Sequence, residues 1–181
     1  MVKILIFRIL GNDLQGIHGN NQTITNLKFT LENESEFPNT TKMFLLNRIY
    51  DLDKKNKIIK MLNSYNYKYI DIPFEKEEFK KINYDKNLDK LIKNNENVRS
   101  NKNIFLGLRE HNLYLINNNG SRNYCIKYGK SNGFDWVFPL DSNAYFTDYH
   151  FEEIYKIIKK NNKAEYLIIP QVRIAHGKLK N

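Results

Sequence analysis

The feature that most constrains the fold is an almost unbroken apolar run at residues 3–10, which ends at Gly11-Asn12-Asp13. A strand with one face in water alternates apolar and polar residues, whereas a continuous apolar run is typical of a strand buried on both faces of a parallel sheet. The glycine and the two polar residues after it indicate a loop. The sequence therefore predicts a buried parallel strand that opens into a loop at its carboxyl end.

The same pattern returns along the chain, with helical spacing of apolar residues in between. The predicted strands are residues 3–10, 42–47, 67–72, 135–140 and 165–173. The predicted helices are residues 22–34, 52–65, 122–131 and 149–161, the third with Ser121 as its N-cap and Gly133 just past its end. Alternating strands and helices with short links predict an α/β fold with a mostly parallel central sheet flanked by helices. We expect one domain over residues 1–181.

Two segments lie outside this alternation. Residues 75–103 are rich in Lys, Glu and Asn and carry few apolar side chains, so they are either a solvated helix or loop or a lid-like insertion. Residues 104–116 fit a helix or an extended connector.

The charge balance, 29 basic against 20 acidic residues, would suit nucleic acid, an anionic membrane or a phosphorylated small molecule. However, Lys, Asn, Ile and Tyr are all abundant, as in the AT-rich genomes of giant viruses and some microbes. The lysines are also spread along the chain rather than gathered with arginine and aromatic residues. We therefore expect no nucleic-acid partner, and a basic nucleic-acid-binding domain stays as an alternative.

Neither a membrane span nor a secretory signal is expected. No stretch approaches the roughly 20 apolar residues that a span needs, and the first apolar run is short and interrupted by Arg8. The single cysteine, Cys125, cannot form an internal disulfide and is expected to serve in packing. These features predict a soluble intracellular or cytoplasmic protein, or one in the host cell or virion if it is viral.

Asp141-Ser142-Asn143 follows the predicted strand at residues 135–140, where open α/β sheets bind ligands. If the backbone stays extended there, Asp141 and Asn143 point to the same side. Their oxygens could then hold Mg²⁺ or Mn²⁺ together with substrate phosphates. The alternative is that Asp141 caps a turn.

Residues 120–143 resemble the middle of GT-A-fold glycosyltransferases of the family-2 kind, in which an Arg-Asn helix start precedes a strand ending in an Asp-x-Asp-type motif. Residues 43–51 resemble the second strand and nucleotide-contacting loop of the same family. The resemblance covers most of residues 2–72 and 117–173. It implies a single Rossmann-like GT-A domain.

The resemblance also implies roles for individual residues. Asp141 and Asn143 match the metal and diphosphate motif, with Asn143 in place of the usual final carboxylate, which weakens the expected metal affinity. Arg122 and Asn123 match the Arg-Asn pair that begins a helix in this family, whose arginine lies near the donor diphosphate. A helix N-terminus at this place would also favour an anion. Asn47 and Asp51 match positions that contact the nucleotide in this family. His176 matches a histidine late in the fold that serves as a metal ligand. A solvated loop histidine is the alternative for His176.

Arg8 and Asn12 lie at the end of the first strand, on the edge of the sheet expected to bind the donor. A buried arginine needs a partner, and either a donor phosphate or a nearby carboxylate would serve. We expect a donor-binding role for both residues.

The expected function is transfer of a sugar from a nucleotide-diphosphate donor, a UDP-sugar, to a protein or glycan hydroxyl. The acceptor base is not identified, and the carboxylates nearest the motif are Asp148, Glu152 and Glu153. Only 38 residues follow Asn143, so we expect a truncated chain, a small variant or a domain of a longer polypeptide. A catalytically silent nucleotide-sugar-binding or interaction module is the alternative.

Overall fold

The structure, a computed structural model, describes residues 1–14, 18–82, 107–161 and 164–171. The chain divides into two compact units, Met1–Thr147 and Asp148–Asn181. The expectation of one domain over the whole chain stays a prediction.

The first unit is built on a four-stranded sheet in which every pair of neighbouring strands is parallel. The strands are β1 Ile4–Leu10, β2 Thr40–Asn47, β3 Lys68–Ile72 and β4 Trp136–Asp141. Their order across the sheet is β3-β2-β1-β4, so β1 is central and Ile4 pairs with both Thr40 and Trp136. The predicted α/β fold with a parallel sheet is confirmed, and four of the predicted strands are present.

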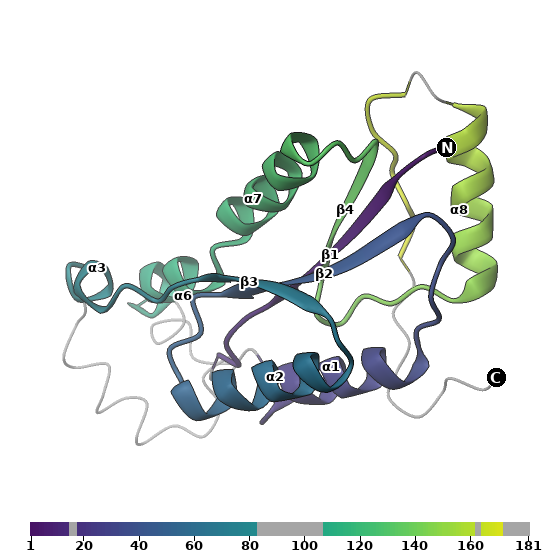
Figure 1. Cartoon of the computed structure of the whole chain (residues 1–181). Helices are drawn as coiled ribbons and strands as arrows, with labels where there is room; N and C mark the ends of the chain where they lie inside the picture. Colours follow the sequence, from purple (N-terminus) through teal and green to yellow (C-terminus); the bar gives the residue numbers. More distant parts are fainter. Residues whose placement is uncertain (15–17, 83–106, 162–163, 172–181) are drawn as a thin grey trace. The chain divides into compact units, whose positions relative to one another are not determined.

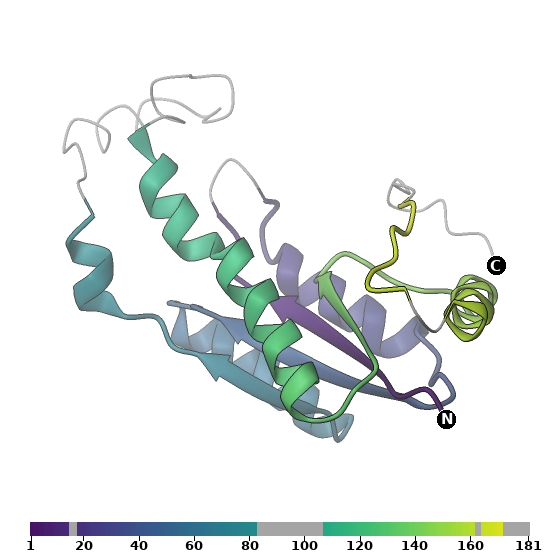
Figure 2. The same ribbon diagram turned by 90° about the horizontal axis from the view of Figure 1, so that it is seen from above.

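Helices cover both faces of this sheet (Figures 1 and 2). The helices of the first unit are α1 Gln22–Asn33, α2 Leu52–Ser64, α3 Lys76–Lys80, α6 Arg109–Ile116 and α7 Asn118–Ser131. α1 and α2 lie on one face and α7 lies on the other. Residues 83–103 of the predicted polar insertion lie outside the described residues.

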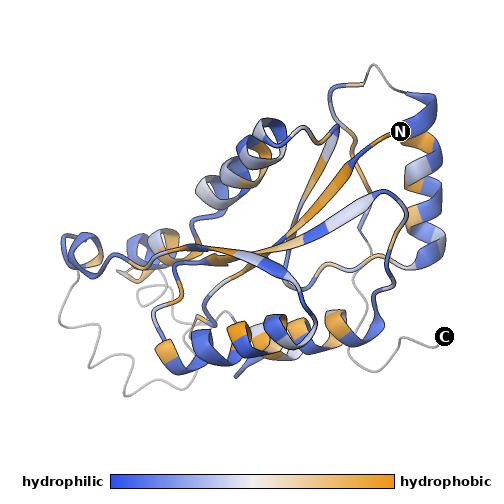
Figure 3. Ribbon diagram, viewed as in Figure 1, coloured by the Kyte–Doolittle hydropathy of each residue, from blue (hydrophilic) through white to orange (hydrophobic). Residues whose placement is uncertain are grey.

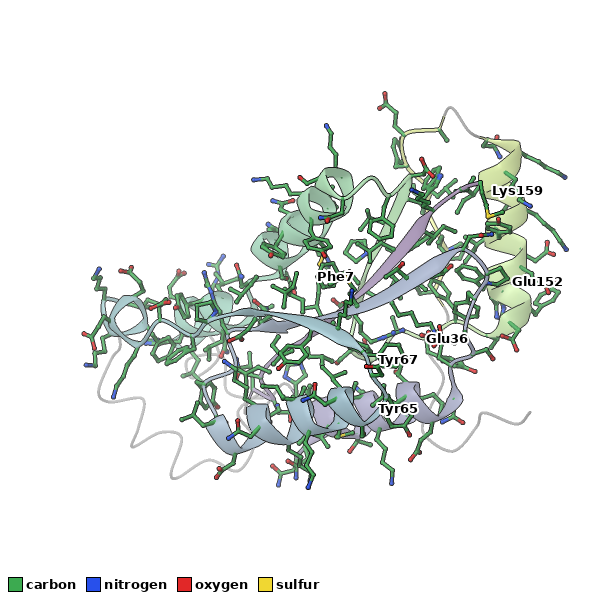
Figure 4. The ribbon with its side chains drawn as sticks, viewed as in Figure 1. Phe7, Glu36, Tyr65, Tyr67, Glu152 and Lys159 are labelled. Atoms are coloured by element: carbon green, nitrogen blue, oxygen red, sulfur yellow. The ribbon has the colours of Figure 1, made fainter. Side chains whose placement is uncertain are left out.

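Alternation along the strands divides the core into two layers. Figure 3 shows apolar colouring along most of β1. Leu10, Phe44 and Leu46 pack with α1 and α2 in one cluster. Phe7 and Leu45 belong to the other cluster, which includes residues of α7. Phe7, marked in Figure 4, makes edge-to-face contacts with two tyrosines of α7. The run at residues 4–10 is therefore apolar apart from Arg8, because both of its faces are covered.

Cys125 lies in the second of these clusters and is fully buried. Burial raises the pKa of its thiol to about 12, so the thiol stays protonated at neutral pH. The expected packing role agrees with this position.

The start of α7 differs from the prediction. The helix begins at Asn118 rather than at residue 122, and its N-cap is Asn117, which has a left-handed backbone with φ 43°. Ser121 lies inside the helix, where its hydroxyl donates back to carbonyls of the preceding turn. The prediction of Ser121 as N-cap was wrong because α6 and α7 meet at Asn117 without the intervening turn that residues 117–121 suggested.

The end of α7 follows the prediction. Gly133 has φ 71°, and the amides of Gly133 and Phe134 donate to the carbonyls of Lys130 and Gly129. This pair of bonds is the usual closure of a helix by a left-handed glycine.

The second unit contains α8, Asp148–Lys160. Phe151, Ile154 and Ile158 recur at helical spacing on this helix, whereas Glu152 and Lys159, labelled in Figure 4, are exposed. The strand predicted at residues 165–173 was wrong over its described part, because residues 165–171 form no strand. An apolar run without a neighbouring strand to pair with does not form a ladder.

None of the described helices combines the length and the apolar character that crossing a membrane would require.

Candidate functional site

The carboxyl ends of the four parallel strands share one edge of the sheet. From β1 the chain adds β2 and β3 on one side, and then returns to place β4 on the other side of β1. In open parallel sheets, ligands bind outside the carboxyl ends of the strands at such a reversal. A cavity of about 230 Å³ lies there, and we call it the switch-point cavity. Its polar lining includes Asn12, Asn47, Asn118, Asp141, Ser142 and Asn143.

Asp141 ends β4 and Asn143 lies in the turn that follows. The Ala144 amide donates to the Asp141 carbonyl at 3.0 Å, so the backbone turns instead of staying extended. The condition under which strand alternation would align the two side chains is therefore not met. Both residues nevertheless line the switch-point cavity.

Arg122 and Asp141 form an ion pair across this edge. Nη2 of Arg122 lies 2.8 and 2.9 Å from the two carboxylate oxygens, and the side chains are 39% and 54% exposed. The resemblance assigned both residues to the donor diphosphate, and the structure brings them together. We call this contact the exposed pair.

The expectation that Arg122 lies at a helix N-terminus was wrong. Because α7 begins at Asn118, Arg122 is in its second turn, one helical turn after the cavity-lining Asn118. Its side chain, rather than free backbone amides, supplies positive charge at this place.

Asn12 and Asn47 are buried and bind backbone groups. Asn12 donates to the Arg48 carbonyl at 2.8 Å and accepts from the Tyr50 amide at 3.2 Å, so it joins the loops after β1 and β2. Asn47 donates to the Ile116 carbonyl at 2.7 Å and accepts from the side chain of Asn117. Both line the cavity while they hold its walls in place.

The other expected site residues are more scattered. Asp51 is the N-cap of α2, where its carboxylate accepts from the Lys54 amide at 3.0 Å. Asn123 is exposed on α7 and does not line the switch-point cavity. His176 lies outside the described residues.

Arg8 does not line the switch-point cavity. Its guanidinium pairs with Glu34 through Nη1–Oε2 at 3.2 Å and Nη2–Oε1 at 2.9 Å, and both side chains are 1% exposed. The sequence left either a donor phosphate or a nearby carboxylate as the partner of Arg8, and the structure shows a carboxylate, that of Glu34. The donor-binding role expected of Arg8 stays a prediction, although its side chain leaves β1 on the face that α1 covers and pairs there with Glu34.

Lys42 completes this buried network, which consists of Arg8, Glu34 and Lys42. Lys42 Nζ lies 3.5 Å from Glu34 Oε2 and 3.6 Å from Glu36 Oε1. Tyr67 donates to Glu36 at 2.5 Å, and the two side chains lie beside each other in Figure 4. Burial, together with this carboxylate, raises the pKa of Tyr67.

A second cavity of about 150 Å³ adjoins the first, since Asn12 lines both. We call it the Lys54 cavity; Asp13, Tyr50, Asp51 and Lys54 also line it. Lys54 Nζ lies 2.8 Å from Asp13 Oδ2, and the side chains are 9% and 15% exposed. Asp13 also accepts from the amide and hydroxyl of Thr23 near the start of α1.

Burial by itself would raise the pKa of Asp13, but Lys54 and Thr23 outweigh it and hold that pKa below its ordinary value of 3.8. Sequence reasoning missed Asp13 and Lys54 because they are far apart in the chain. The polar loop after the first strand was the available signal for Asp13, and Lys54 gave none.

Arg48 is a further residue that sequence reasoning missed. Its φ is 51°, an uncommon conformation for a residue with a long side chain. Its guanidinium carbon lies 4.1 Å from the centre of the Tyr114 ring, and Nη1 donates to the Tyr114 carbonyl at 2.8 Å. Strain held in place by such contacts is common beside binding sites.

The expected divalent cation would find one carboxylate among the described residues of the switch-point cavity, that of Asp141. Within the described part of the chain, no group of three or more His, Cys, Asp or Glu side chains could hold a metal ion. Mg²⁺ is often held by one or two carboxylates plus substrate phosphates and water. These residues therefore fit a cation that binds together with a diphosphate, rather than a site made by protein alone.

No family model matches the chain, and neither a curated protein nor a solved structure matches it.

Proposed function

We propose that the first unit binds a nucleotide-diphosphate sugar, with UDP as the nucleotide, as the donor-binding part of a GT-A-like glycosyltransferase. The observation that carries the proposal is a polar cavity at the reversal of strand order, with the Arg122–Asp141 pair at that edge of the sheet. The acceptor would be a hydroxyl of a protein or glycan.

The exposed pair suits a site that exchanges partners. Exposed ion pairs contribute about 0–1 kcal/mol to stability, so breaking this one on ligand binding costs little. Arg122 would then face the diphosphate, and Asp141 would face a cation that accompanies it. The attraction between unit charges at 4 Å rises from about 1 kcal/mol in water to about 4 kcal/mol at an effective dielectric near 20, so partial enclosure favours the exchange.

The two cavities together suit an elongated donor. The diphosphate and sugar would lie in the switch-point cavity, and the nucleoside in the adjoining Lys54 cavity beside Asp51 and the half-exposed ring of Tyr50. This arrangement keeps Asp51 in the nucleotide-contacting role that the resemblance implied.

In a sugar transfer, the site would have to stabilise the nucleoside diphosphate as it leaves. When the glycosidic bond breaks, the nucleoside diphosphate gains negative charge, which a preorganised guanidinium can stabilise. Mn²⁺ or Mg²⁺ held by Asp141 and Asn143 would supply further positive charge to the same oxygens.

A catalytically silent nucleotide-sugar-binding module is the second candidate, and one observation favours it. Asp141 is the single carboxylate among the described residues that line the switch-point cavity, and it already pairs with Arg122. An inverting transfer needs a further base for the acceptor. Donor binding without hydrolysis or transfer, over a panel of nucleotide sugars, would decide for the module.

The first test is thermal stabilisation by UDP and by GDP, each with and without Mn²⁺, for the wild type and Asp141→Ala. A ligand at 100 times its dissociation constant adds about 2.7 kcal/mol of stability. We expect UDP with Mn²⁺ to stabilise the wild type, and Asp141→Ala to abolish the effect. Mn²⁺ alone should have little effect.

Asp135→Ala is the matched control, because Asp135 is also exposed but precedes β4 and accepts from the Lys3 amide at the opposite edge of the sheet. It should keep the stabilisation by UDP. No stabilisation of the folded wild type by either nucleotide would refute the donor-binding proposal.

A further inference from the structure

The buried network reaches the turn that carries Asp141. Arg8 donates to the Ala144 carbonyl from Nη2 at 2.9 Å and from Nε at 3.3 Å. Ala144 is also the residue whose amide closes the turn onto the Asp141 carbonyl. The guanidinium therefore holds the last residue of the turn directly.

Glu34 holds the same segment two residues later. Its Oε1 accepts from the Phe146 amide at 3.2 Å while it pairs with Arg8. The network is thus hydrogen-bonded to the backbone of residues 144 and 146 through the Arg8 and Glu34 side chains, which are 1% exposed. The turn itself is more open, since Asp141 and Asn143 are exposed.

Stability alone does not account for this network. Removing two charges from water costs several kcal/mol per ion, and a buried ion pair is often no more stabilising than apolar residues of similar volume. In some proteins such groups instead select one conformation among several. Here the selected feature would be the position of the turn that carries Asp141, Ser142 and Asn143.

We propose that Arg8 and Glu34 are positioning residues that set the place of the Asp141–Ala144 turn, and through it the affinity of the switch-point cavity for a nucleoside diphosphate. The affinity part rests on the proposed function, whereas the positioning part does not. Neither Arg8 nor Glu34 lines the cavity, so their effect on a ligand passes through the turn.

The test replaces the pair as a unit, Arg8→Met with Glu34→Met, which leaves no unpaired charge of the pair behind. Lys42 keeps the Ser35 carbonyl, 2.5 Å from its Nζ, and Glu36 as partners. The matched control is Lys55→Met with Asp71→Leu, which removes an ion pair between α2 and β3 that is only partly exposed. Neither Lys55 nor Asp71 lines the described cavities.

Two measurements are made on each folded variant. The first is amide hydrogen exchange in ligand-free protein, resolved by NMR at Ala144 and Phe146 and along β1 and β4. The second is the dissociation constant for UDP and for GDP with Mn²⁺. We expect exchange at the two amides to rise to the level of an open loop, while the strands stay protected.

The dissociation constant should rise about ten- to a hundredfold, as when residues that orient a binding group are lost. The control should change neither quantity. Unchanged exchange at both amides would overturn the positioning role. Faster exchange with unchanged UDP affinity would overturn its link to the ligand. A wild type that binds neither nucleotide would refute the proposed function, and the exchange data would still decide the positioning role.

Arg8→Lys covers the case in which the double variant does not fold. A lysine keeps the charge beside Glu34, but its ammonium lacks the planar fork that joins Glu34 and Ala144. We expect Phe146 to stay protected and Ala144 to lose protection. Protection retained at both amides would contradict the specific role of the guanidinium.

Discussion

Two arginine–carboxylate ion pairs lie on opposite faces of the same sheet. They share the same chemical groups but differ in burial and in the further hydrogen bonds that they make. Arg8 and Glu34 are 1% exposed, make further bonds to the backbone and belong to a network with Lys42. Arg122 and Asp141 are 39% and 54% exposed, and of the two only Asp141 lines the switch-point cavity. From the sequence, both arginines are expected to bind the donor. The structure shows that one is buried and the other is exposed, and we infer different roles from that difference.

The difference in burial indicates which of the two pairs can exchange its partner for a charged ligand. A buried pair whose partner is removed leaves an uncompensated charge, so its groups are committed to each other. An exposed pair already competes with water and salt, so its groups remain available to a charged ligand. Four measurements test this division, in order of decreasing effect.

The largest effect is expected for Glu34→Ala. It leaves Arg8 buried without its carboxylate, and breaking such pairs costs about 3–5 kcal/mol of the free energy of unfolding. Equilibrium unfolding in urea measures it. Glu32→Ala, on the exposed side of the same helix, is the control and should cost far less. A loss for Glu34→Ala no larger than for the control would break the comparison.

Arg122→Gln should act on ligand binding rather than on folding. If the exposed pair is free to exchange partners, the variant loses the stabilisation by UDP with Mn²⁺, about 2.7 kcal/mol at 100 times the dissociation constant. Lys127→Gln, which removes an exposed positive charge from the same helix, should retain it. Equal stabilisation of both variants would show that Arg122 takes no part in binding.

Asp13→Asn tests a pair of intermediate burial. The amide removes the negative charge beside Lys54, and we expect a loss of about 1–3 kcal/mol near neutral pH, as for a buried group left without its partner. Because the folded state lowers the pKa of Asp13, the wild-type advantage is present above the unfolded pKa and disappears as pH falls through the lower folded value.

Urea unfolding of both proteins over a range of pH measures this dependence. The difference between wild type and Asp13→Asn should therefore shrink only below about pH 4, where an unfolded aspartate begins to protonate. A difference that grows on acidification would contradict the sign of the shift.

The smallest effect is the contribution of the exposed pair to folding. A double-mutant cycle of Arg122→Gln and Asp141→Asn in ligand-free protein should give a coupling of about 0.2–1 kcal/mol that falls at high salt. A salt-independent coupling of several kcal/mol would mean that the pair is structural, and the two regions would then not differ as proposed.

The fold was largely readable from local pattern. The strands at residues 4–10, 40–47, 68–72 and 136–141 were predicted from short segments rich in apolar residues, which are typical of strands in a parallel sheet. The segment at residues 165–171 shows the limit of this reasoning. Its composition suits a strand, but a strand also needs a partner, and composition does not report one.

The site was readable in part. Asp141, Asn12 and Asn47 could be placed at the binding edge because the carboxyl ends of parallel strands share that edge. The helix containing Arg122 was predicted with its start four residues late, because Ser121 suggested an N-cap, whereas α6 and α7 meet at the left-handed backbone of Asn117.

The sequence by itself determined the layers, the parallel sheet and the edge at which polar residues gather, because periodicity and strand ends are local properties. Only the tertiary structure decided which charges meet. Arg8 lies 26 residues from Glu34, and Arg122 lies 19 residues from Asp141. Whether such a pair is sealed in the core or open to solvent depends on the elements packed around it, and no local pattern in the chain records that packing.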